Sequence, residues 1–103
     1  DSIAIGCVQN KTMRNLISYI QSPIAITSAN ISGTADDILI TENEAIKHMG
    51  NNVNYMLRSK NKSKYKSSST IIKVTGNKIE LLREGDIKFE EIKAKLGSGI
   101  QYE

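Results

Sequence analysis

The chain has 103 residues, of which 39% are hydrophobic and 24% are charged, and its formal net charge is +3. This length predicts one small domain with a thin core, and no stretch reaches the roughly 18 apolar residues of a membrane span. The first residues also lack the basic-then-apolar order of a signal peptide. Cys7 is the one cysteine, which excludes an intrachain disulfide and a multi-cysteine metal site. We therefore expect a cytoplasmic protein, because thiols stay reduced there.

The first third of the chain predicts a strand, a helix and a second strand. Residues 2–8 are apolar and strand-like, and residues 12–21 have apolar side chains at helical spacing, with Thr12 as the expected N-cap. Pro23 ends this helix, and residues 24–27 predict a short buried strand. This order of elements favours two neighbouring parallel strands.

The middle of the chain predicts a second helix and a third strand. Thr41 and Glu44 have the spacing of a capping box, and Gly50 marks the expected end of the helix. Residues 53–57 predict the strand, and residues 58–69 are polar without apolar periodicity, which indicates an exposed loop.

The last third predicts a hairpin and a helix. Strand-like residues 69–74 and 78–83 flank Gly76-Asn77, a dipeptide that suits a tight hairpin turn. A helix is expected at residues 89–96. The predicted fold class is therefore α/β with a mixed, twisted sheet.

Small polar residues end the predicted strand at residues 24–27 and continue after it, namely Thr27, Ser28, Asn30, Ser32 and Gly33. Ligands of α/β sheets gather at the carboxyl ends of strands, where such groups suit phosphate oxygens or a zwitterionic amino acid. By composition alone, the same residues are more typical of a Ser/Thr or Asx turn without a ligand. Arg83 also stands at a predicted strand end, where it can clamp a phosphate or carboxylate or form a surface salt bridge.

Three strings occur in a fixed order, "SPIAITSANISG", "STII" and "LLREG", followed by a helix with "EEI". Together they resemble the carboxyl-terminal half of the YrdC family of threonylcarbamoyl-adenylate synthases, from about residue 2 to about residue 96. The resemblance implies a YrdC-like partial domain over residues 1–103, with a tail at 97–103. It also implies the family's reaction, in which ATP, L-threonine and bicarbonate give threonylcarbamoyl-AMP and pyrophosphate for threonylcarbamoyladenosine modification of tRNA.

Site residues follow from the same resemblance, position by position. It implies ATP binding by Ser28, Asn30 and Arg83, and threonine binding by Thr27 and Ser69. Such a reaction needs positioning and charge neutralisation, so no residue is expected to act as a covalent catalyst. Mg²⁺ is expected to arrive on the ATP phosphates, without a protein-bound metal site.

The chain departs from the family pattern in ways that bear on activity. The family's amino-terminal half, with its Lys-x-Arg element, does not match any part of these 103 residues. Gly6-Cys7-Val8 stands where the family has Arg-x-Pro, and Lys73 stands where it has an acidic residue. We expect either half of an enzyme whose other half is a separate chain, or a split or degenerate fragment without catalysis of its own.

A basic RNA-binding module is the alternative function. Five basic residues fall within nine positions around Tyr65, namely Arg58, Lys60, Lys62, Lys64 and Lys66. Such a segment can hold the phosphate backbone of tRNA or double-stranded RNA, with Tyr65 as a stacking ring. It is also typical of a solvated loop that binds nothing.

Overall fold

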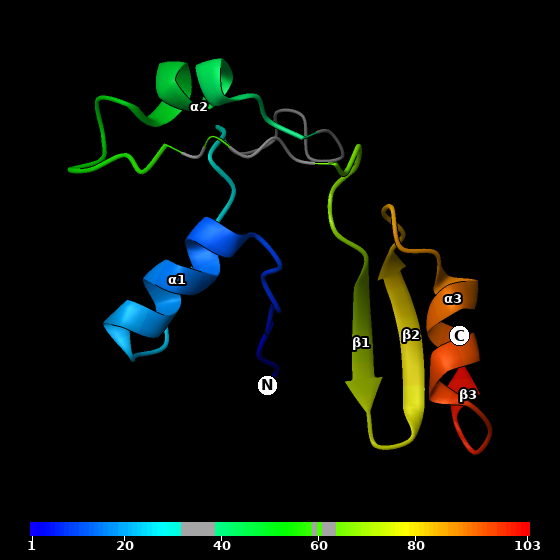
Figure 1. The fold of residues 1–103 in the computed structure, drawn as a ribbon. Helices are drawn as coiled ribbons and strands as arrows, with labels where there is room; N and C mark the ends of the chain where they lie inside the picture. Colours follow the sequence, from blue (N-terminus) through cyan, green and yellow to red (C-terminus); the bar gives the residue numbers. More distant parts are fainter. Residues whose placement is uncertain (32–38, 59, 61–63) are drawn as a thin grey trace.

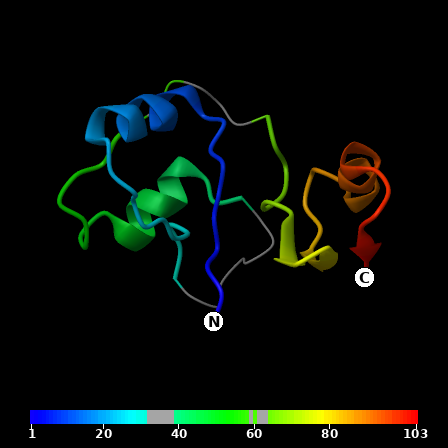
Figure 2. The same cartoon turned by 90° about the horizontal axis from the view of Figure 1, so that it is seen from below.

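A computed structural model describes residues 1–31, 39–58, 60 and 64–103. Its elements form two groups, with helices α1 and α2 in one and the strands with helix α3 in the other (Figures 1 and 2). In chain order they are α1 (Lys11–Ile20), α2 (Glu42–Met49), β1 (Ile71–Thr75), β2 (Lys78–Arg83), α3 (Phe89–Leu96) and β3 (Gln101–Tyr102). No helix in the described ranges is both long enough and apolar enough to cross a membrane.

The three strands form one mixed sheet in the order β1-β2-β3, which confirms the predicted α/β class. β1 and β2 are antiparallel, and β3 is parallel to β2. The turn between β1 and β2 lies at Gly76-Asn77, as predicted, with Gly76 at a φ of 60°. Glycine reaches this angle without a steric penalty, and the two tight hairpin turns, types I′ and II′, both need a positive φ at this first central position.

The core of the described chain lies between the sheet and α3. Ile79 of β2 and Phe89 of α3 are its buried hydrophobic residues, with exposed fractions of 5% and 8%. The ring of Phe89 meets that of Tyr102 edge to face, with centroids 6.0 Å apart. The ammonium group of Lys93 lies 4.8 Å from the Phe89 ring centroid, so a cation–π contact covers this small core.

Helix boundaries follow local capping. The side chain of Asn10 accepts a hydrogen bond from the backbone N–H of Met13, so Asn10 caps α1, and the expectation of Thr12 is wrong. At α2 the predicted capping box is confirmed, because Thr41 and Glu44 each accept from the other's backbone N–H. Gly50 follows its last residue as the C-cap, also as predicted.

The strands predicted at residues 2–8, 24–27 and 53–57 are not formed. Ile5, for example, is 86% exposed and Leu57 is 62% exposed. A strand needs a neighbour that pairs its backbone and covers its apolar side chains, and no described segment does so for these residues. The parallel pair predicted from the first two segments is therefore wrong as well.

Candidate functional site

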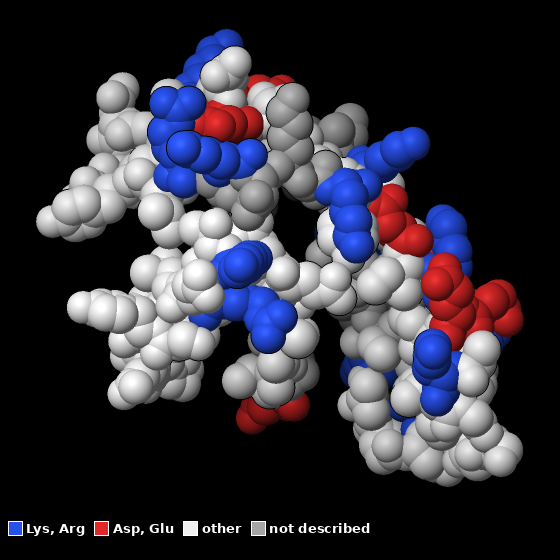
Figure 3. Space-filling view, in the orientation of Figure 1, with Lys and Arg blue, Asp and Glu red and all other residues white. Residues whose placement is uncertain are grey.

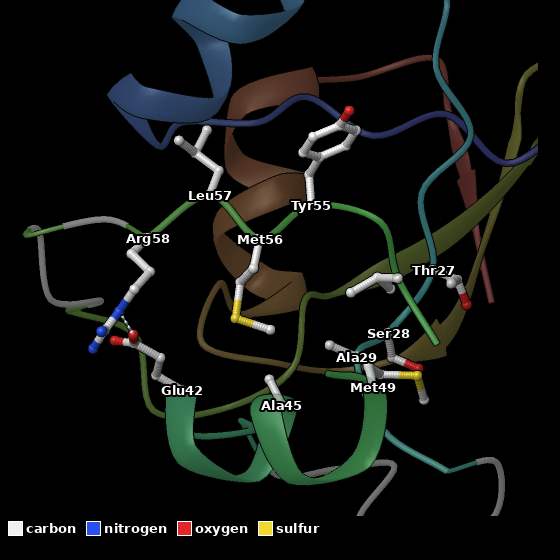
Figure 4. Close-up of a pocket in the computed structure, with 11 residues that line it drawn as sticks. Thr27, Ser28, Ala29, Glu42, Ala45, Met49, Tyr55, Met56, Leu57 and Arg58 are labelled. Carbon is white, nitrogen blue, oxygen red and sulfur yellow. Dashed lines mark hydrogen bonds and ion pairs between the residues drawn. The ribbon is translucent and has the colours of Figure 1, made fainter. Parts of the chain in front are cut away.

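A cavity of about 550 Å³ lies between residues 27–29, helix α2 and residues 53–58. Apolar side chains provide much of its wall, with Met56 and Ala45 facing each other across it (Figure 4). One end carries an ion pair between Arg58 and Glu42. The cavity can therefore hold an apolar group between charged and hydroxyl-bearing ends.

Thr27 and Ser28 line the other end of this cavity (Figure 4). Both residues are exposed, and neither hydroxyl has a hydrogen-bond partner among the described residues. Each can donate to an oxygen and accept from an N–H group of a bound molecule. The structure thus brings together two of the predicted site residues, with polar groups available to a ligand.

Asn30 lies outside the cavity wall and is buried, with an exposed fraction of 7%. Its side-chain amide donates a hydrogen bond to the carbonyl of Ile31 at 3.2 Å. The backbone N–H of Ile31 in turn donates to Nδ1 of His48, at the end of α2. Asn30 therefore contacts the backbone of Ile31, which is hydrogen-bonded to α2, and its predicted contact with ATP stays a prediction.

Ser69 and Arg83 lie together in the other group of elements. The Nε–H of Arg83 donates to the backbone carbonyl of Ser69 at 3.0 Å, while the terminal nitrogens of its guanidinium have no described partner. Arg83 thus holds the segment just before β1 against the end of β2. The terminal N–H groups of its guanidinium stay available to donate to an anion. No described contact joins this pair to Thr27 and Ser28.

Gly85 and Asp86 hold the segment that precedes β1, a role that the sequence analysis did not predict. The backbone N–H of Gly85 donates to the Thr70 hydroxyl at 2.9 Å. Asp86 accepts from the backbone N–H groups of Ser67 at 3.1 Å and Lys66 at 2.6 Å. These two hydrogen bonds, of which the one from Ser67 has the larger effect, hold the pKa of Asp86 below its ordinary value. The "REG" string thus has a structural function here.

The basic segment is exposed at every position that the structure describes. Arg58 pairs with Glu42, and Lys62 lies outside the described residues; Lys60, Lys64 and Lys66 are exposed. The Tyr65 hydroxyl donates to Oε1 of Gln9 at 2.8 Å, which connects this segment to the residues just before α1. Lys and Arg side chains lie on one face over the start of α1 and over the segment leading into β1 (Figure 3).

Comparison with protein-family models matches residues 1–85 to the Sua5/YciO/YrdC family, whose description is "Telomere recombination". A search of curated proteins and a search of solved structures gave no match. The family match includes the cavity residues Thr27 and Ser28 and extends through Gly85.

Proposed function

Because the chain belongs to the Sua5/YciO/YrdC family, we propose that it is part of an L-threonylcarbamoyladenylate synthase. The reaction converts ATP, L-threonine and bicarbonate into threonylcarbamoyl-AMP and pyrophosphate, for tRNA modification in the cytoplasm. The observation that carries this proposal is the pair of hydroxyls of Thr27 and Ser28 on the cavity wall, which have no hydrogen-bond partner among the described residues.

The chemistry of this reaction suits a site built from hydroxyls and cations. A carbamate oxygen attacks the α-phosphate of ATP and pyrophosphate leaves, so the site must align two anions and neutralise the charge on the leaving group. In the proposed enzyme Ser28 donates to phosphate oxygens and Thr27 contacts the threonine. Mg²⁺ enters on the ATP phosphates.

This chain supplies little of the positive charge that adenylate formation needs. Arg58 is the one basic residue on the described cavity wall, and Glu42 already pairs with it. Loss of a single well-placed donor from such a site typically costs about 3 kcal/mol of transition-state stabilisation. We therefore propose that the amino-terminal half of the family's domain supplies the missing cations and that these 103 residues alone have no activity.

The test is release of pyrophosphate that depends on both threonine and bicarbonate. The 103-residue chain alone should give none, and addition of the amino-terminal half of a complete family member as a separate chain should restore it. Ser28→Ala should then lower the rate by about 10² to 10³, whereas Ser18→Ala, on the exposed surface of α1, should not. Arg83→Ala should abolish release. An unchanged rate of pyrophosphate release in Ser28→Ala would overturn the proposal.

RNA binding is the second candidate, because the hydrogen bond of Tyr65 to Gln9 brings the basic segment to the start of α1. With tRNA as the probe, three Lys→Gln changes should flatten the slope of log affinity against log salt by about 3, at roughly 0.9 per phosphate contact. The changed residues are Lys60, Lys64 and Lys66. The control removes the same charge elsewhere, at Lys47, Lys73 and Lys95. Equal slopes in the two variants would exclude the segment as the contact.

A further inference from the structure

His48, in the last turn of α2, connects this helix to the segment that carries the cavity hydroxyls. The backbone N–H of Ile31 donates to Nδ1 of His48 at 3.4 Å. The carbonyl of Ile31 accepts a hydrogen bond from the side-chain amide of Asn30, which is buried. Both polar groups of the Ile31 backbone are thus bound by side chains, and one of these side chains belongs to α2.

This contact lies next to the candidate site. Met49, which follows His48, lines the cavity together with Ser28 and Ala29 (Figure 4). Ile31 follows Ser28 by three positions, a stretch of chain that spans at most about 11 Å. A shift of Ile31 relative to α2 would therefore move the Ser28 hydroxyl relative to the opposite wall of the cavity.

The acceptor in this contact is a nitrogen atom that titrates. Nδ1 of a histidine accepts a hydrogen bond only while it carries no proton, and in the imidazolium form both ring nitrogens are donors. Histidine side chains take up this proton between about pH 8 and pH 5. A proton on Nδ1 would place two N–H groups against each other. The contact is therefore present at high pH and is lost as the pH falls.

Charged groups face His48 from its own helix. The pKa of Glu44 lies below its ordinary value, chiefly because of hydrogen bonds from Thr41. Positive charge on His48 and Lys47 contributes as well, so the Glu44 carboxylate lies near the imidazole. Residues 27–31, on the other side of the contact, include no ionisable side chain. A proton on His48 therefore acts on that segment through the hydrogen bond rather than through attraction or repulsion of a charge.

We propose that His48 is a pH-sensitive contact that fixes one wall of the cavity. The neutral imidazole holds Ile31, and with it Ser28, against α2, and uptake of a proton releases both. This inference concerns the wall of the cavity and not its ligand, so it goes beyond the proposed function and does not depend on it.

Amide NMR of the 103-residue chain between about pH 8 and pH 5 tests the contact directly. Exchange of the Ile31 amide is measured relative to an unstructured peptide at the same pH. Loss of one hydrogen bond should lower the protection of this amide about fivefold as the pH falls. The step should have the same midpoint as the ring Cε1–H resonance of His48, and the Ser28 amide resonance should shift with it. Unchanged protection of Ile31, or a midpoint that differs from that of His48, would overturn the proposal.

Two variants of His48 test whether the imidazole causes the step. His48→Gln has an acceptor oxygen that does not titrate and His48→Phe has no acceptor, so neither variant should show the step. Lys47→Gln is the matched control, because it removes a charge at the neighbouring position and keeps the imidazole. Unchanged protection of the Glu44 amide, which donates to the Thr41 hydroxyl, verifies that α2 is intact in all three variants. A step that survives in a His48 variant, or that is lost in Lys47→Gln, would refute the inference.

The pH-sensitive contact and the proposed function can fail independently. Threonine-dependent pyrophosphate release in the assay above, with protection of Ile31 that does not change with pH, would refute this contact and leave the proposed function standing. A step at Ile31 that depends on His48, without any release in that assay, would refute the proposed function and leave the contact standing.

Discussion

Gly85→Ala tests whether the "REG" string has the structural function described above. A Cβ atom at this position would lie 1.9 Å from the carbonyl oxygen of Ser68 and 2.9 Å from the backbone nitrogen of Thr70. Atoms of this kind do not approach closer than 3.0 Å, so the two backbones must separate by more than 1 Å. That separation breaks the hydrogen bond from Gly85 to Thr70 and strains the two that Asp86 accepts.

The expected loss of stability is about 3 kcal/mol. Overpacking against atoms that cannot move aside costs typically 1–3 kcal/mol, and each hydrogen bond lost adds about 1 kcal/mol. This corresponds to a change of more than 100-fold in the equilibrium between folded and unfolded sheet. Amide exchange at β2 and the midpoint of urea unfolding measure this loss of stability. Gly6→Ala is the matched control, because no atom lies within 4 Å of its Cβ position. Equal urea midpoints for the two variants would refute the reasoning.

Two further predictions concern capping and pH. Thr41→Ala removes the capping box of α2 and should lower the local stability of this helix by about 1 kcal/mol, seen as faster amide exchange in α2, whereas Asn43→Ala on its exposed face should not. The pKa of Asp86 lies below its ordinary value of 3.8, because the backbone N–H groups of Ser67 and Lys66 bind its ionised form. The stabilisation by Asp86 is thus fully present above about pH 4 and is lost as the pH falls through the lowered folded-state pKa. Acid titration followed by circular dichroism should show this step in the wild type and a smaller one in Asp86→Asn; identical profiles would contradict the assignment.

Sequence reasoning predicted the elements whose determinants are local. The capping box at Thr41 and the turn at Gly76-Asn77 each depend on residues within a few positions of one another, so their patterns are visible in the sequence. The strand predicted at residues 2–8 depends on pairing with another segment. The apolar pattern predicts that these residues can be buried, and it does not supply the partner that buries them.

The residues of the candidate site divide in the same way, into those with a local sequence pattern and those that depend on distant partners. Thr27 and Ser28 were predicted from their position after an expected strand, and they line the cavity although that strand is not formed. The pair of Glu42 with Arg58 was missed because sixteen positions separate the two residues and no local pattern connects them. Asp86 was missed because its partners are backbone N–H groups, which every residue but proline carries. An acidic residue directly after a glycine at a strand end was the available signal.

Stability and function are coupled in this fold through the uneven distribution of its contacts. The sheet with α3 has a small core and the hydrogen bonds that join residues 66–70 to 85–87. Residues 2–8 and 24–27 expose apolar side chains, and among the described residues their backbone groups have no backbone hydrogen-bond partner. A partner that binds only the ordered form of these segments stabilises them by mass action, by about 2.7 kcal/mol at a hundredfold excess over its Kd. Because Thr27 ends the second segment and Ser28 follows it directly, ordering of this segment would also fix the hydroxyls of the cavity.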